Sequence, residues 1–333
     1  MKGPWCLSLD RTATWITYGV CLALLAGCGS EESSKGTTDD GAGVAQAPAV
    51  PGLQASNAFY YYADVEGAWA FYRDILGFET VADYGFAKIL RVASSSYLTL
   101  VDAEFGMHTV EEPKSVTLAV VTEQVEAWYA YLRASGVAMR AEYAAREGRP
   151  HDGFVAVDPE GYYLEFERFN PHPENDALMP VLSAFEPLYA ESRPSELGVQ
   201  ATVLWLYYRD LDVMQQFYED LLGATLLVDQ GWAKVYQVAG SGFIGLVDGE
   251  RGLHQATEQK GVTVSFFTDD VDGWFERATA RPGFELRTPE VTGESGRVRV
   301  FVAYDPEGYF LEWDTFLEVE ENDALLQFLN ENR

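Results

Sequence analysis

The chain has 333 residues, of which 47% are hydrophobic, 14% aromatic and 23% charged. This is the composition of a globular protein, and the length allows two domains that each have a core. The formal net charge of −29 argues against nucleic-acid binding, because an acidic surface repels phosphates.

Residues 1–27 have the features of an export signal. Lys2 and Arg11 supply positive charge, and the short apolar run from Trp15 to Gly27 suits a signal peptide better than a membrane span. The run ends in LAGC, which resembles the lipobox of bacterial lipoproteins. This resemblance implies cleavage before Cys28, lipidation of its thiol and a lipid anchor in the bacterial cell envelope. Gly29, in place of Asp, favours the outer membrane by the same analogy; an ordinary signal peptide is the alternative.

Residues 28–56 lack periodicity and are rich in Gly, Ser, Ala and Pro, which is typical of a flexible tether. The three cysteines are Cys6, Cys21 and Cys28. Processing would leave only the lipidated one, so we expect no disulfide and no thiol nucleophile in the exported domains.

The first folded segment, residues 57–192, reads as two successive strand-helix-strand-strand-strand units. The first has a helix beginning near Val65 and closed by Gly77, then strands at 80–83, 87–93 and 97–102. The second has a strand at 116–121, a helix at 125–135 and a final hairpin, FVAVDPEGYYLEF, that begins at Phe154. DPEG suits a type I turn, and the strand after it places Glu165 and Glu167 on one face and apolar residues on the other.

The second folded segment, residues 200–333, repeats the first. Residues 71–108 align without a gap on residues 217–254, and the hairpin returns as FVAYDPEGYFLEW from Phe301, with Glu312 in the place of Glu165. This is a duplicated domain and not a short repeat. The sequence therefore predicts an α+β fold with two tandem domains. Short helices are expected after each hairpin, at 175–189 and 322–329.

The motifs FYRDILGF and FYEDLLGA, followed about ninety residues later by DPEGYYLEF and DPEGYFLEW, resemble those of the vicinal oxygen chelate superfamily. That group includes glyoxalase I, extradiol dioxygenases, fosfomycin-resistance enzymes and bleomycin-binding proteins. The resemblance covers residues 57–170 and 203–316. It implies that each domain is a pair of βαβββ modules whose curved mixed sheet forms a cup. It does not choose a function, because the same fold supports enzymes and simple binders.

The resemblance also implies four metal-ligand positions in each cup, commonly filled by His, Gln or Glu. Glu165 and Glu312 fill the last of them, and Asn57 could assist in the first cup. The remaining positions hold no histidine in either copy; they fall at Asn57, Thr99 and Thr117, and at Val203, Gly245 and Thr263. We therefore predict no cofactor, with a divalent metal at Glu165 or Glu312 as the alternative. Otherwise these carboxylates would pair with Lys88 and Lys234 or with backbone donors.

Features present in both copies supply the candidate ligand-binding residues. Lys88 and Lys234 could hold an anionic group of a ligand, or could instead bond Asp83 and Asp229. His108 and His254 have the chemistry of general bases, or could cap the ends of strands. The aromatic first-strand residues Phe59 and Tyr61, and in the second copy Trp205 and Tyr207, share one face of the strand. Together with Asn57 they are expected to line the cups. His151 has no counterpart and could gate the first cup or lie exposed in a loop.

Two functions of different classes follow. The first is a binding module, in which an envelope-anchored protein captures a small apolar or planar molecule in its cups. The second is a metal-dependent enzyme of glyoxalase or dioxygenase type that uses Glu165 or Glu312. An assembly protein is a third, weaker option. The expected partners are a small-molecule ligand and, through Cys28, a membrane. The sequence leaves open whether a cup forms within one domain or by exchange of modules between domains.

Overall fold

In the computed structural model, the described residues are 50–145 and 148–331. The predicted signal, Cys28 and most of the tether lie outside them. No helix in this described part is long and apolar enough to cross a membrane.

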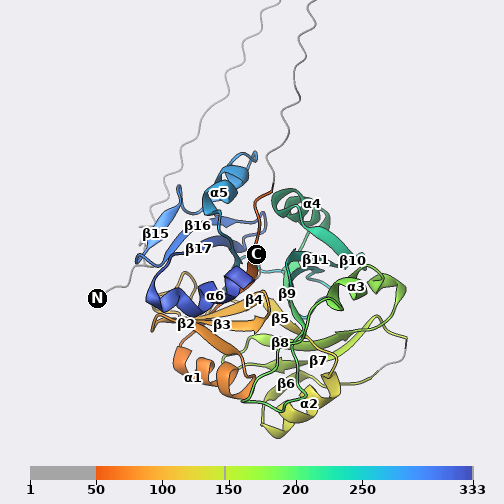
Figure 1. Cartoon of the computed structure of the whole chain (residues 1–333). Coiled ribbons are helices and arrows are strands. Elements are labelled where there is room, and N and C mark those ends of the chain that lie inside the picture. Colours follow the sequence, from red (N-terminus) through yellow and green to blue (C-terminus); the bar gives the residue numbers. More distant parts are fainter. Residues whose placement is uncertain (1–49, 146–147, 332–333) are drawn as a thin grey trace, which may run out of the picture. The chain divides into compact units, whose positions relative to one another are not determined.

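The first half of the folded chain contains both predicted βαβββ units (Figure 1). The first unit comprises β1 (Ala55–Tyr62), α1 (Val65–Ala70), a π-helical turn (Phe71–Ile75), β2 (Glu79–Asp83), β3 (Ala87–Ala93) and β4 (Ser96–Asp102). The second comprises β5 (Val116–Val121), α2 (Val125–Ala134), β6 (Ala138–Ala141), β7 (His151–Val157) and β8 (Tyr163–Phe169). A 3-10 turn (Pro173–Asn175) and the short helix α3 (Leu178–Leu182) follow.

The second half repeats this order. Its first unit is β9 (Ala201–Tyr208), α4 (Leu211–Leu222), β10 (Thr225–Asp229), β11 (Ala233–Ala239) and β12 (Gly242–Asp248). Its second unit is β13 (Val262–Phe267), α5 (Val271–Thr279), β14 (Glu285–Leu286), β15 (Thr292–Glu294), β16 (Val298–Tyr304) and β17 (Phe310–Phe316). A 3-10 turn (Glu320–Asn322) leads into α6 (Asp323–Glu331). The predicted α+β fold with curved mixed sheets is confirmed.

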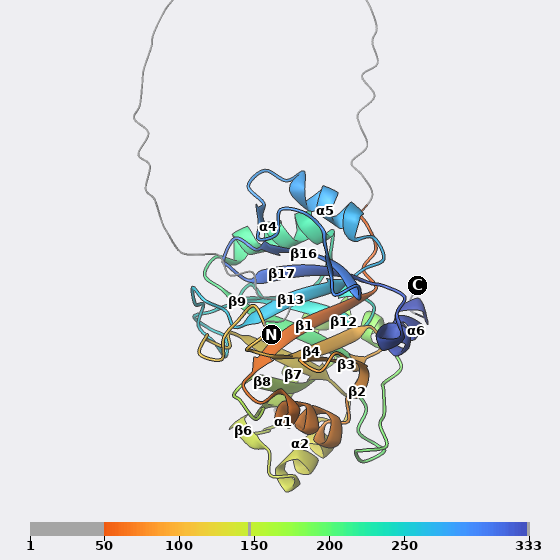
Figure 2. The ribbon, with the colours of Figure 1, turned by 90° about the vertical axis from the view of Figure 1, so that its left-hand side faces the viewer.

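The two sheets are each built from one module of either half. The sheet that we call sheet A joins the first module to the last in the order β14-β16-β17-β13-β1-β4-β3-β2, and β15 pairs with β16. Sheet B joins the two middle modules in the order β10-β11-β12-β9-β5-β8-β7-β6. The joints are the antiparallel pairs β1–β13 and β5–β9. Figure 2 shows the strands of sheet A following one another from β16 to β2. The question left open by the sequence is thereby answered: the modules are exchanged.

One core lies between the sheets and under the helices. It contains side chains from the central strands of both sheets, such as Tyr60 and Leu204, and from the helices, such as Trp128 and Trp274. Because side chains alternate along a strand, the opposite face of each sheet is left to form a cup. Separate small clusters occupy those faces, around Ile89 in sheet A and around Val235 in sheet B.

The repeated hairpin fastens the modules together. Asp158 Oδ1 accepts backbone hydrogen bonds within the DPEG turn at 3.0 and 2.8 Å, and its Oδ2 accepts from the hydroxyls of Tyr62 at 2.6 Å and Tyr72 at 3.0 Å. Gly161 has a φ of 100°, which favours glycine at the end of this turn. Asp305 makes the equivalent contacts in the second copy, to Tyr208 and Tyr218.

The tyrosine after each turn continues the connection into the other half of the chain. The Tyr162 hydroxyl accepts from the backbone N–H of Tyr61 at 2.9 Å and donates to the carbonyl of Gly261 at 2.7 Å. Tyr309 does the same with Tyr207 and Ser115, at 2.9 and 2.5 Å. The motif is therefore repeated for a structural reason, because each copy holds a sheet joint.

Candidate ligand-binding site

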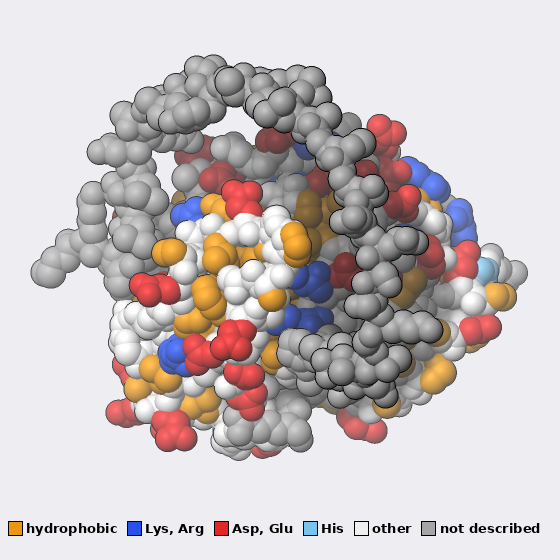
Figure 3. All heavy atoms as spheres, turned by 90° about the horizontal axis from the view of Figure 1, so that it is seen from above, with side chains coloured by type: hydrophobic (Ala, Val, Ile, Leu, Met, Phe, Trp, Pro, Cys, Tyr) orange, Lys and Arg blue, Asp and Glu red, His pale blue; other side chains and the backbone are white. Residues whose placement is uncertain are grey.

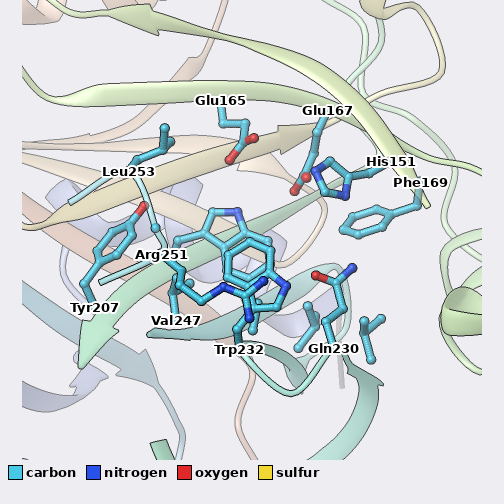
Figure 4. A pocket seen from close by; sticks show the side chains of 15 residues that line it. His151, Glu165, Glu167, Phe169, Tyr207, Gln230, Trp232, Val247, Arg251 and Leu253 are labelled. Carbon is cyan, nitrogen blue, oxygen red and sulfur yellow. The ribbon is translucent and has the colours of Figure 1, made fainter. Parts of the chain in front are cut away.

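A cavity of about 250 Å³ lies on the cup face of sheet B. It adjoins a wider opening of about 560 Å³ along the edge of the same sheet, and the two share His151, Glu165, Gln230 and Trp232 in their linings. Figure 4 shows Glu165, Glu167 and His151 around this space, with Arg251 and Trp232 on the other side. We call this cavity the sheet B cup.

Strand β8 supplies the acidic wall of the sheet B cup. As expected from alternation, Leu164 and Phe166 are buried in the main core while Glu165 and Glu167 line the cavity. Glu167 is only 1% exposed and its Oε1 has no hydrogen-bond partner among the described atoms. Phe169 lies further along the strand and packs against α3 residues, including Leu178, which close that end of the cup.

Aromatic side chains form the rest of the wall. Trp205 and Tyr207 come from β9 and Trp232 precedes β11. The Trp205 ring lies directly over Gly245 of β12, where an added Cβ would stand only 1.9 Å from the ring carbon Cε3. A glycine at this position is therefore required for the indole to lie flat on the sheet.

The predicted histidine and tyrosine of this copy lie at the opposite end of the cup. The Tyr207 hydroxyl is hydrogen-bonded to Thr117 Oγ1 at 2.8 Å, and the ring contacts His254 edge-on at 5.0 Å between centroids. His254 also stacks on Tyr163 at 4.4 Å. Burial lowers the pKa of His254 to about 4, so it is a neutral packing partner of the tyrosines at neutral pH.

Burial removes the hydration of the ionised form and so raises the pKa of both carboxyl groups in the sheet B cup. Burial brings the pKa of Glu165 to about 7. The pKa of Glu167 is raised further, first by burial and then by repulsion from Glu165. The indole N–H of Trp205 faces Glu167 and offsets this in part, although the two groups do not meet hydrogen-bond geometry. Burial and the charge of Arg149 lower the pKa of His151.

Sheet A has the same residue types but a tighter interior. Glu312 and Asp314 replace the two glutamates and are 0% and 2% exposed. Ser265 Oγ donates to Asp314 Oδ2 at 2.6 Å. Tyr84, in the place of Gln230, donates a hydrogen bond to Asn322 at 2.5 Å and packs with α6 residues such as Leu325.

The other candidates in sheet A are also engaged in structural contacts. Tyr61 is hydrogen-bonded to Thr263 Oγ1 at 2.8 Å. His108 lies against Tyr61 and against the ring of Phe310, and its Nδ1 is 2.6 Å from Glu112 Oε2. Asn57 is 3% exposed and its Oδ1 accepts from Thr99 at 3.0 Å.

The two lysines lie outside the cavity lining. Lys88 sits beside Leu90 on the helix-covered side of β3, where its Nζ is 2.9 Å from Asp83, 3.0 Å from Glu66 and 4.8 Å from the Trp69 ring centre. Lys234 Nζ is 2.8 Å from Asp229. Both contacts correspond to the aspartate pairing given above as the alternative. Neither lysine pairs with a last-strand carboxylate.

Of the seven ligand-binding candidates, only Tyr207 lies in the cavity lining. Trp205, which the sequence placed beside Tyr207 on the cup face of its strand, also lines it. The sequence gave no role to Gln230 and Arg251, which line it as well. A difference between the copies could have indicated both, since Gln230 and Arg251 stand where the first copy has Tyr84 and Phe105.

Comparison with known proteins agrees with this architecture. The family model described as the Glyoxalase/Bleomycin resistance protein/Dioxygenase superfamily matches residues 55–166 and again 199–313. The chain belongs to this superfamily. Among solved structures, it is similar to glyoxalase I from Zea mays, with 15% identity, a TM-score of 0.57 and coverage of 85% of this chain and 96% of that one. A putative dioxygenase from Bacillus subtilis subsp. subtilis str. 168 has 16% identity, a TM-score of 0.55 and coverage of 80% and 85%. A search of curated proteins finds no match.

The donor set expected for a metal in this superfamily is not provided by the described side chains. In sheet B the positions alongside Glu165 are Val203, Gly245 and Thr117, and the Thr117 hydroxyl is already bonded to Tyr207. Among the residues that the structure describes, no three His, Cys, Asp or Glu side chains are grouped so as to hold a metal. Glu165 and Glu167 line the cavity together with His151, but the three described side chains are not grouped closely enough to complete a transition-metal centre.

Proposed function

We propose that this superfamily member binds a small planar molecule in the sheet B cup, without a metal. The observation that carries the proposal is the open cavity between the aromatic side chains Trp205, Tyr207 and Trp232 and the carboxylates of β8. Mostly apolar concave sites with a few polar groups are typical of small-molecule binding. The sheet A counterpart of Glu165, Glu312, is instead fully buried, so we assign the function to one cup of the two.

The first test uses 2-naphthylmethanol, a neutral planar probe, in isothermal titration with the purified full-length chain. Gly245→Ala pushes a methyl group into the Trp205 ring, so we expect affinity to fall at least about tenfold. Gly293→Ala is the matched control, because nothing lies within 4 Å of an added Cβ at that position. Absence of binding by the wild-type chain, or equal binding by both variants, would refute the proposal.

The alternative is the metal-dependent enzyme of glyoxalase or dioxygenase type. Metal analysis of the purified chain separates the two functions. We expect probe binding to persist after treatment with a chelator. Stoichiometric Fe, Ni, Mn or Zn that is lost in Glu165→Gln or Glu312→Gln would favour the enzyme instead.

We also propose that the chain is anchored to the bacterial cell envelope through a lipid on Cys28. The support is the LAGC sequence after an apolar run. Cys28→Ser should move the chain from the membrane fraction to the soluble fraction and abolish incorporation of labelled fatty acid. An unchanged membrane fraction would argue for an ordinary signal peptide or another form of attachment.

A further inference from the structure

The floor of the sheet B cup carries two carboxyl groups that form no ion pair within the described part of the chain. Glu167 is 1% exposed and its Oε1 lacks a hydrogen-bond donor. Figure 4 shows the carboxyl groups of Glu165 and Glu167 both directed into the cavity. A buried carboxylate without a donor is costly. A ligand that supplies donors or positive charge at this point would therefore gain more than one that does not.

His151 lines the cavity beside Glu167 without forming an ion pair, and burial lowers its pKa. The arginine side chains near the cup are engaged elsewhere. Arg168, which neighbours Glu167 in sequence, points to the other face of β8, where it bonds Asp152 and Glu126 at 3.0 Å each. Arg251 lines the cavity but is an exposed residue, and its guanidinium lies 4.9 Å from the centre of the Trp232 ring. Among the described residues neither Glu165 nor Glu167 forms an ion pair with Lys, Arg or His. The cup is therefore acidic at its floor, where the two glutamates lie, and basic at its exposed side, where Arg251 lies.

The walls add a second feature that selects the ligand. The half-buried rings of Trp205 and Trp232 line the cavity, and aromatic rings attract cations as well as planar apolar groups. Aromatic rings beside an unpaired carboxylate are the combination that recognises an organic cation.

We propose that the ligand is a planar molecule with a basic nitrogen, an amine or amidine, which enters the sheet B cup and hydrogen-bonds to Glu165 and Glu167. This inference rests on the proposed function and specifies its ligand class. The ring system lies against the aromatic wall, and the nitrogen is placed at the floor, away from Arg251. An acidic ligand would have the reverse orientation, with its anion on Arg251.

The test compares three probes of matched size by isothermal titration with the full-length chain at pH 7.5 and about 0.15 M salt, where long-range attraction to the acidic chain is screened. The probes are 2-naphthylmethylammonium, 2-naphthylmethanol and 2-naphthylacetate. We expect the ammonium probe to bind at least about tenfold more tightly than the alcohol, and the acetate most weakly. Equal affinities, or tightest binding of the acetate, would overturn the inference but leave the proposed function standing. If none of the three binds, both fail.

Two isosteric substitutions test which carboxyl group of the cup binds the basic nitrogen of the probe. Glu167→Gln should remove most of the preference for the ammonium probe over 2-naphthylmethanol. Glu165→Gln provides the same test should Glu167→Gln fail to fold, which circular dichroism would reveal. Glu312→Gln is the matched control, because Glu312 is the sheet A counterpart of Glu165. An equal loss of preference in Glu312→Gln would mean that the overall charge, and not the sheet B cup, selects the cation.

Discussion

Acidic side chains on the cup faces are kept partly protonated by the fold. Burial raises the pKa of Glu165 to about 7 in sheet B and that of Asp314 to about 6 in sheet A. Burial, followed by repulsion from Asp314, raises the pKa of Glu294 to about 7, and the same two causes raise that of Glu312. The folded chain therefore binds more protons than the unfolded chain between about pH 4 and pH 7.

The first prediction concerns stability against pH. Because the folded state holds the extra protons, the free energy of unfolding should fall as the pH rises through this window. Glu312→Gln removes one such group, so we expect it to raise the free energy of unfolding at pH 8 by about 1 kcal/mol or more and to change it little at pH 4. Urea unfolding at the two pH values measures this. Glu104→Gln, at an exposed residue, is the control, and stability that rises from pH 4 to pH 8 would contradict the account.

At this scale the sequence predicted which strand residues face the cup better than it predicted the arrangement of the aromatic rings. Alternation along β8 was sufficient to place Glu165 and Glu167 on one face. Alternation also placed Trp205 on the cup face, but not the way its ring lies, because that depends on the absence of a side chain at Gly245, forty residues away in a neighbouring strand. Such complementarity becomes visible only when the strands are paired.

The repeated hairpin is the element that ties the two halves together. In the first copy the Tyr162 hydroxyl joins the backbone of β1 to that of Gly261, which precedes β13. Both partner groups are buried with the joint, so loss of the hydroxyl leaves a donor and an acceptor without a partner.

The second prediction follows from this double role. Tyr162→Phe should lower the free energy of unfolding by about 1–3 kcal/mol without a change in the dependence on denaturant. Tyr309→Phe should act alike, because it makes the same two bonds in the other copy. Tyr189→Phe, at a side chain that is 55% exposed, should have almost no effect. Equal stability of all three variants in guanidinium unfolding would show that the hairpin tyrosines do not stabilise the joints between the modules.

Elements were predicted closely where hydrophobic periodicity was strong. The expected strand at 116–121 and helix at 125–135 appear as β5 and α2 with almost the same ends. The face of Lys88 could not be predicted, because β3 is buried on both sides and carries apolar residues on each. Only the packing of α1 over one face shows that Lys88 lies beneath Trp69 and away from the cup.

The whole molecule depends on exchanged modules, which the sequence does not specify. The two halves have similar sequences, so β1 could in principle pair with β5, the counterpart of β13 in its own half. The structure pairs β1 with β13 and β5 with β9. Each half alone would therefore expose two central strands as free edges.

The third prediction is that the halves cannot fold as separate monomers. Residues 50–192 and 200–333 produced singly should be unfolded or self-associated, and mixing them should give a 1:1 complex with the circular dichroism of the intact chain. Gel filtration with light scattering distinguishes these states. A folded, monomeric half would contradict the module exchange.

The molecular surface gives little support to the assembly option. Among the described residues, the large hydrophobic side chains that are exposed are Val50, Tyr189 and Val213, which are scattered along the sequence. On the face in Figure 3, acidic side chains are spread among basic and apolar ones. A docking surface normally needs a contiguous apolar patch, so the sheet B cup is the better candidate for function.

The most direct test of the central claim is the position of a bound probe. A crystal of the chain soaked with 6-bromo-2-naphthylmethylammonium would reveal the bromine by anomalous diffraction. We predict one bromine site per chain, in the sheet B cup beside Trp205, with the nitrogen within hydrogen-bond distance of Glu165 or Glu167. A bromine in the sheet A cup, or a metal ion between the probe and either glutamate, would contradict this prediction.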